Sequence, residues 1–186
     1  MTACIDQFRM PRYREIPDVG LYLDQTVKYI NRFLAPLGCM EITSSMVSNY
    51  VKKGYISNPV RKQYDADQIA YLFFISIAKS VLSMENIVQL FRMQRKTYTA
   101  EVAYDFFCME LENMLQYTFG LKGQLDVVGT TEQTDAKTML RSTIIAVTHI
   151  IYLNNRFDTM ISTAITPAET RLSLPEIPLE TAEHAE

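Results

Sequence analysis

Apolar residues recur at helical spacing through most of the chain. The first such pattern predicts a helix over residues 20–35, which ends where Pro36 and Gly38 interrupt it. Two longer patterns predict helices over residues 99–119 and from residue 134 or 135 to about 155. The sequence therefore predicts an all-α fold.

A shorter helix is predicted between Thr43, whose hydroxyl can cap the first turn, and Gly54, which ends it. The apolar residues between Met46 and Val51 fall on one side of this helix. Short hydrogen-bonding side chains and lysines, with no carboxylate among them, occupy the other side. These are Ser44, Ser45, Ser48, Asn49, Lys52 and Lys53.

A loop with two basic residues follows this helix. Residues 57–59, Ser-Asn-Pro, are a turn signal, and Arg61 and Lys62 come directly after them. Tyr64 then offers an aromatic anchor at the end of the loop.

Two further helices are predicted beyond this loop. Asp65 and Gln68 have the spacing of a capping box and open a helix through Lys79, and Ser83 caps a shorter helix after it. The basic loop is therefore held between helices, as a loop that clamps a DNA backbone would be.

Charge is distributed unevenly along the chain. The net charge is −3, yet residues 1–64 contain nine basic and five acidic residues, whereas residues 65–186 contain nine and sixteen. A basic face on an acidic protein is suited to an anionic partner. A solvated basic face without any partner is the alternative interpretation.

The order of residues in this stretch resembles the head of MerR-type transcription regulators. In that head a recognition helix ends at a glycine, a wing with an arginine and a tyrosine follows, and a capped helix leads to a serine-capped one. The matching residues are Ile42, Thr43, Val47, Tyr50, Lys53, Gly54, Ile56, Arg61, Tyr64, Ile69, Leu72, Ile75, Ser83, Met84, Glu85 and Ile87. The resemblance implies a winged helix-turn-helix head that binds double-stranded DNA.

The whole chain, including IPDVGLYLDQTVKYIN and VSNYVKKGYISNP, looks more closely like a bacterial family known as domain of unknown function 1836. That family is thought to be related to MerR, so the resemblance implies a DNA-binding regulator without a defined ligand. Ser48 and Asn49 stand where MerR-type heads usually have an arginine and a tyrosine. The target sequence is therefore not implied.

We accordingly expect a DNA-binding transcriptional regulator of MerR-like type. Lys52, Lys53, Arg61 and Lys62 are expected to contact phosphates. Base contacts are expected from four short polar side chains. These are Ser44, Ser45, Ser48 and Asn49.

A protein-protein interaction module that reuses the same head without sequence-specific DNA binding is the alternative hypothesis. An enzyme is the weakest one, because the sequence has no nucleophile paired with a base, no phosphate-binding loop and no cluster of metal ligands. We expect no catalytic residues, metal or cofactor.

The second half is rich in aromatic residues, and its last helical pattern has an apolar face broad enough to be covered on two sides. Either the other helices of the monomer or a second subunit would cover that face. His149 lies in this apolar run without other ligands at metal-binding spacing, so it is expected to be a packed or capped histidine rather than a metal ligand. We expect a head in residues 1–95, a helical dimerisation or sensing region in residues 96–166 and a flexible acidic tail in residues 167–186. The expected partners are DNA, a second copy of the chain, and a small-molecule or protein effector.

The cellular compartment is predicted from three absences. Cys4, Cys39 and Cys108 form no close pair that would indicate a zinc or redox motif. Charges near the N-terminus argue against a signal peptide. The longest apolar run, residues 71–78, is far shorter than the roughly 18 residues of a membrane span. We expect a cytoplasmic protein without a membrane partner.

Overall fold

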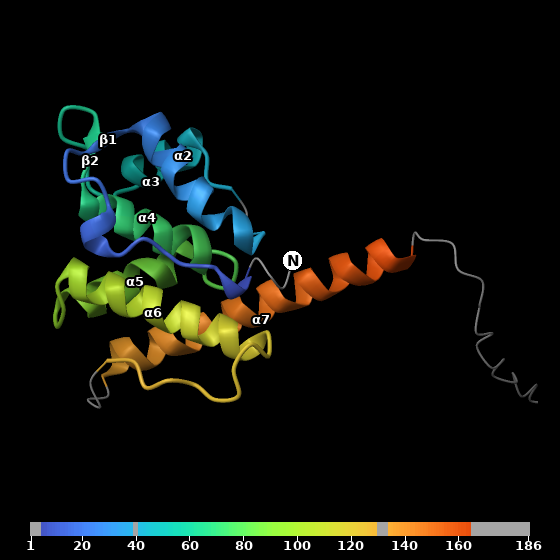
Figure 1. Ribbon diagram of the computed structural model, residues 1–186. Coiled ribbons are helices and arrows are strands. Elements are labelled where there is room, and N and C mark those ends of the chain that lie inside the picture. Colours follow the sequence, from blue (N-terminus) through green and yellow to red (C-terminus); the bar gives the residue numbers. More distant parts are fainter. Residues whose placement is uncertain (1–4, 39–40, 130–133, 165–186) are drawn as a thin grey trace, which may run out of the picture.

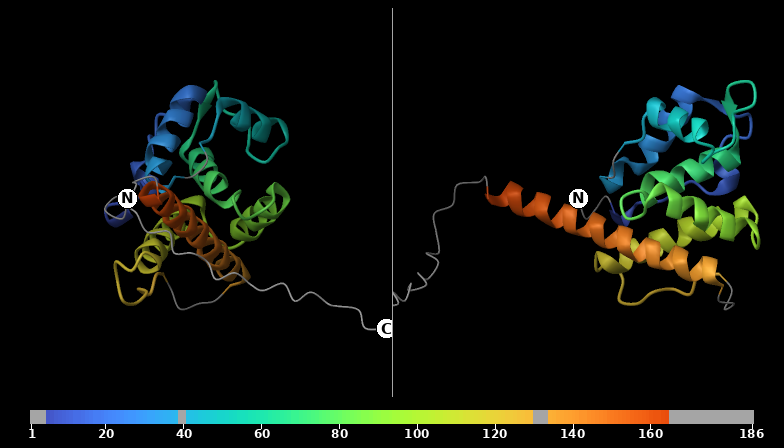
Figure 2. Two further views of the ribbon diagram at one scale, coloured as in Figure 1. Left: turned by 90° about the vertical axis from the view of Figure 1, so that its right-hand side faces the viewer. Right: turned by 180° about the vertical axis from the view of Figure 1, so that it is seen from behind.

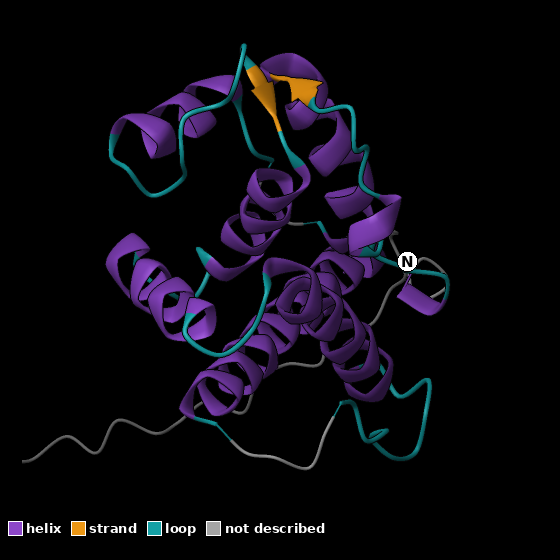
Figure 3. Ribbon diagram, turned by 90° about the vertical axis from the view of Figure 1, so that its left-hand side faces the viewer, coloured by secondary structure: helices purple, strands orange, loops and turns teal. Residues whose placement is uncertain are grey.

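The computed structural model describes residues 5–38, 41–129 and 134–164, and within these ranges the chain is mostly helical (Figure 1). The all-α class is confirmed, and the two short strands pair antiparallel, with Leu21 opposite Tyr64 (Figure 3). The elements are η1 (Tyr13–Glu15), β1 (Leu21–Tyr22), α2 (Leu23–Leu34), η2 (Ala35–Leu37), α3 (Ser44–Lys52), β2 (Gln63–Tyr64), α4 (Ala66–Ala78), α5 (Met84–Arg95), α6 (Ala100–Thr118) and α7 (Asp135–Ala164).

The predicted helix starts are confirmed by their capping hydrogen bonds. The Thr43 hydroxyl accepts from the Met46 N–H at 3.2 Å, and the Asp65 carboxylate accepts from the Gln68 N–H at 2.8 Å. Ser83 and Thr99 cap α5 and α6 in the same way. Each cap satisfies an N–H group that the first helical turn would otherwise leave without a partner.

The last helix is longer than predicted. α7 runs to Ala164 rather than ending near residue 155, because residues 156–164 contain neither glycine nor proline to stop it. Its final turns extend past the rest of the molecule (Figures 1 and 2). The predicted acidic tail, residues 167–186, lies outside the described residues, as do Cys4 and Cys39.

The core is organised around α4, whose residues from Gln68 to Ala78 are all buried except Tyr71. The Phe73 ring lies 5.9 Å from that of Tyr29 on α2 and 6.0 Å from that of Tyr104 on α6. The neighbouring Phe74 packs against Phe91 on α5 and Phe107 on α6. Helices before and after residue 95 therefore pack against the same helix, α4. No helix of the described ranges is long and apolar enough to cross a membrane.

The segment before η1 is fastened to α6 by a two-pronged ion pair. The Arg12 guanidinium donates to both carboxylate oxygens of Glu112, at 2.7 and 2.6 Å, and the Met10 N–H donates to the same carboxylate at 2.8 Å. Beside it Cys108 is buried, and burial raises the pKa of its thiol to about 12. The Cys108 thiol is therefore a buried, protonated core group.

Replacing Glu112 tests how much this fastening contributes to stability. Glu112→Ala leaves the Arg12 guanidinium and the Met10 N–H without their acceptor, and we expect it to lower the free energy of unfolding by about 2–3 kcal/mol in urea titrations. The control is Arg14→Ala, which breaks the exposed Arg14–Glu101 pair, whose arginine side chain is 86% exposed, and should change stability by less than about 0.5 kcal/mol. Equal effects of the two variants would contradict this interpretation.

Candidate nucleic-acid interface

The segment just before α3 is held to α2 by a side-chain amide. The Asn31 side chain accepts a hydrogen bond from the Ile42 N–H and donates one to the Ile42 carbonyl, both at 2.9 Å. Val47 and Tyr50 are buried beneath the helix, and burial raises the pKa of the Tyr50 hydroxyl. Their burial fixes which side of α3 faces solvent.

The opposite side of α3 is exposed, as predicted. We call it the polar face of α3. It consists of Ser45, Ser48, Asn49, Lys52 and Lys53. Ser44 is only partly exposed, and its hydroxyl donates to the Asp24 carboxylate on α2 at 2.9 Å. This contact, which sequence reasoning missed, leaves Ser44 less available to a partner than the other four positions.

The two basic residues of the loop stand at the tip of a tight turn. Val60 and Gln63 exchange backbone hydrogen bonds of 3.1 and 2.9 Å, so residues 60–63 form a two-residue hairpin turn, here called the basic turn. Arg61 and Lys62 both have positive φ, at 51° and 66°, and both are exposed. Such turns favour Asn-Gly, so the residue types at these positions do not indicate this geometry.

The base of the basic turn is firmly anchored. Tyr64 is 4% exposed and lies in β2, which pairs with β1. The Gln68 side-chain amide donates to the Ser57 carbonyl at 2.8 Å, while its oxygen accepts from the Asp65 N–H. The start of α4 therefore holds both ends of the loop, and Tyr64 serves as the predicted anchor.

Acidic groups lie beside the basic ones. The pKa of the Glu85 carboxyl at the start of α5 is lowered by hydrogen bonds from its own backbone and from Ser83, and by the charge of Lys53. The Lys53 ammonium also lies 6.0 Å from the centre of the Tyr55 ring. The lysine is thus positioned by its neighbours without a direct ion pair among the contacts of the described residues.

α3 and the basic turn lie at the same end of the molecule, away from α7 (Figures 1 and 3). The eight residues predicted as a site are therefore gathered at one end, on one helix and one turn. Among the described residues, no group of three or more His, Cys, Asp or Glu side chains is placed to hold a metal ion.

A scan of protein families found one that covers this region. The family model described as Domain of unknown function (DUF1836) matches residues 11–107, which is slightly more than half of the chain. The matched range includes α3, the basic turn, α4 and α5. No curated protein and no solved structure matched the chain.

The backbone of the basic turn yields a stability prediction. Arg61→Asn together with Lys62→Gly places residues that accept positive φ at both positions, and we expect the free energy of unfolding to rise by about 1–2 kcal/mol in urea titrations. The control exchanges the two residues, Arg61→Lys with Lys62→Arg, which keeps the backbone conformation and should leave stability unchanged. A loss of stability in the Asn-Gly variant would rule out strain in this turn.

Proposed function

The chain belongs to the family described as Domain of unknown function (DUF1836), and we propose that this member is a DNA-binding transcriptional regulator with a MerR-like winged helix-turn-helix head. α3 is the recognition helix in this proposal, and the basic turn is the wing. The observation that carries it is the basic turn, where two exposed cations occupy backbone positions that favour asparagine and glycine. Backbone strain retained at an exposed, anchored tip is typical of a functional position.

The polar face of α3 supplies both kinds of contact that DNA binding needs. Ser45, Ser48 and Asn49 can donate to and accept from base edges in the major groove. Lys52 and Lys53 follow one turn later and would neutralise phosphates. Ser44 has a lesser role, because its hydroxyl is bonded to Asp24.

The wing would place Arg61 and Lys62 against the neighbouring backbone. The anchoring of the loop by Tyr64 and Gln68 supports this role, because a fixed tip loses little conformational entropy on binding. The carboxylates of Asp24 and Glu85, beside the basic residues, would repel DNA phosphates if the DNA bound in another orientation. The charges would therefore favour one orientation of the DNA on the protein.

A homodimer completes the proposal. α7 buries Ile144, Val147 and Ile151 against the body of the protein, yet the opposite side of the helix is also apolar. We call this side the outer stripe of α7. It consists of Met139, Ile145, Leu153, Phe157 and Met160, which are 42–62% exposed.

A second copy of the chain is the occupant that fits the outer stripe. The stripe follows one face of a long helix, which is the surface that two helices bury in a coiled pair. His149 lies on the same side and is exposed, so it is not packed within the single chain. Two heads joined in this way would read two half-sites about one helical turn of DNA apart.

The alternative function, a protein-protein interaction module, has one observation in its favour. Val19, Tyr22 and Val60 around the strands are 77%, 53% and 72% exposed. Pull-downs from native lysate with and without nuclease, using the wild type and Val60→Asp, separate the two functions. Partners that survive nuclease and no longer bind to Val60→Asp favour the alternative.

The DNA-binding proposal predicts affinity that falls steeply with salt. In fluorescence anisotropy titrations against genomic fragments, Lys53→Ala and Arg61→Ala should each remove one phosphate contact and make the slope of log affinity against log salt shallower by about one. The Asn-Gly variant of the basic turn should bind more weakly although it is more stable. Lys96→Ala, which removes an exposed charge after α5, is the control and should bind like the wild type.

Two results would refute DNA binding. One is the absence of salt-sensitive binding at micromolar protein. The other is that Lys53→Ala and Arg61→Ala both retain the affinity and salt dependence of the wild type.

The dimer is tested separately by sedimentation velocity. Phe157→Glu places a charge on the outer stripe, and we expect it to convert a dimer into a monomer without loss of helicity. Thr159→Glu adds the same charge to α7 on a side facing away from the stripe and should remain dimeric. A wild-type protein that is monomeric at tens of micromolar would contradict the dimer but not DNA binding by one head.

A further inference from the structure

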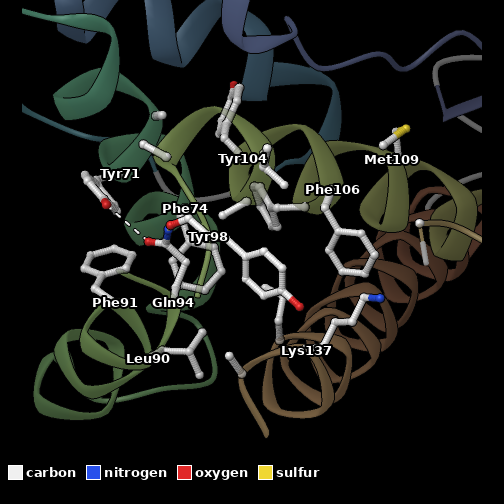
Figure 4. A pocket seen from close by; sticks show the side chains of 18 residues that line it. Tyr71, Phe74, Leu90, Phe91, Gln94, Tyr98, Tyr104, Phe106, Met109 and Lys137 are labelled. Carbon is white, nitrogen blue, oxygen red and sulfur yellow. Dashed lines mark hydrogen bonds between the residues drawn. The ribbon is translucent and has the colours of Figure 1, made fainter. Parts of the chain in front are cut away.

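A cavity of about 250 Å³ lies among α4, α5, α6 and the start of α7 (Figure 4). It is separate from the polar face of α3 and the basic turn, and it plays no part in the proposed DNA contact. Its walls are almost entirely apolar and aromatic. They include Phe74 from α4, Leu90 and Phe91 from α5, and Phe106, Phe107 and Met109 from α6.

The size of the cavity restricts what it can hold. A cavity of roughly 150 Å³ lined by apolar side chains is large enough for benzene. The present cavity is therefore large enough for one aromatic ring with a short substituent, or an aliphatic molecule of similar bulk. Most drug-sized binding clefts are larger, at roughly 300–1,000 Å³.

Two buried tyrosine hydroxyls among the lining residues, those of Tyr98 and Tyr104, have no hydrogen-bond partner in the described part of the chain. Tyr98 lines the cavity from the segment between α5 and α6, and its hydroxyl is buried without a hydrogen-bond partner in the described part of the chain. In Figure 4 the Tyr98 ring lies among the lining side chains, with its hydroxyl directed toward the side where Lys137 lies. The Tyr104 hydroxyl, also buried, points away from the centre of the cavity.

The other polar side chains at the cavity already have defined contacts. Gln94 donates to the Tyr98 carbonyl at 2.6 Å, and its oxygen accepts from the Tyr71 hydroxyl at 3.2 Å. The buried Lys137 ammonium lies 5.3 Å from the centre of the Phe106 ring. Buried hydroxyls are nearly always hydrogen-bonded, so the Tyr98 donor is the group that a ligand would satisfy.

We propose that this cavity binds a small apolar molecule, about the size of a substituted benzene, that carries one oxygen acceptor for the Tyr98 hydroxyl. The apolar walls supply most of the binding, because they remove the ligand's hydrocarbon surface from water. The hydroxyl selects among molecules of the same shape, because only a ligand with an acceptor satisfies it. This site does not depend on the proposed DNA binding, and a failure of either leaves the other standing.

The test uses two probes of the same shape. Acetophenone has a carbonyl oxygen where α-methylstyrene has a methylene group, so they differ mainly in the acceptor. Each is titrated into the full-length, isotope-labelled protein, and backbone amide shifts of the cavity residues are followed by NMR. We expect acetophenone to bind with saturable shifts at millimolar concentration and on the order of fivefold more tightly than α-methylstyrene.

Two variants separate selection by the hydroxyl from filling of the cavity. Tyr98→Phe keeps the ring but removes the donor, and the preference for acetophenone should disappear. Ala103→Phe places a ring inside the cavity and should abolish the binding of both probes. Lys28→Phe is the control, because it adds a ring on the exposed side of α2, away from the cavity, and it should bind both probes like the wild type.

The proposal is overturned if acetophenone, at concentrations up to about 10 mM, gives no saturable shifts at the cavity residues of the folded wild type. Such small ligands bind no more weakly than this order of magnitude when a site exists. It is also overturned if α-methylstyrene binds as tightly as acetophenone, or if Tyr98→Phe retains the preference. Tyr98→Phe preserves the apolar walls, so these outcomes stand even if Ala103→Phe proves unstable.

Discussion

α4 has almost no polar side, and the need to cover it on every side determines the arrangement of the other helices. Phe73 faces α2 and Tyr104, while Phe74 faces α5 and Phe107. A helix that is apolar all round is unstable unless other elements surround it. We therefore expect the helices on both sides of residue 95 to unfold together, although the chain between α5 and α6 is a short loop.

The candidate interface and the cavity depend on this same helix in different ways. The first turn of α4 holds the basic turn through Asp65 and Gln68, whereas its later turns form one wall of the cavity through Ala70 and Phe74. The two sites therefore contact the same helix. If a ligand in the cavity displaced α4, the residues that hold the basic turn would move with it.

Much of the fold was predictable because its signals are local. Thr43, Asp65, Ser83 and Thr99 each cap a helix by a contact with a residue three positions away, and such spacing is visible in a sequence. The conformation of Arg61 and Lys62 was not predictable, because neither residue type favours positive φ and the backbone pairing of Val60 with Gln63 that closes the turn has no residue-type signal. The bond between Ser44 and Asp24 joins residues twenty positions apart and has no local signal.

The extent of α7 was missed for a different reason. The buried positions end near Ile151, so the pattern that marks a core-facing helix stops there, while the residues that follow remain good helix formers. Exposure of Leu153 and Phe157 then depends on what lies outside the single chain. An apolar pattern alone does not distinguish a core from a subunit interface.

The continuity of α7 has a geometric consequence for two joined heads. Each residue of a helix advances it by about 1.5 Å and turns it by about 100°. The outer stripe begins beside the body at Met139 and continues to Met160 without a glycine or proline between them. In the proposed dimer, the positions at which the two α7 helices pair would therefore fix both the distance between the heads and their rotation around a DNA duplex. A flexible linker would leave both of these variable.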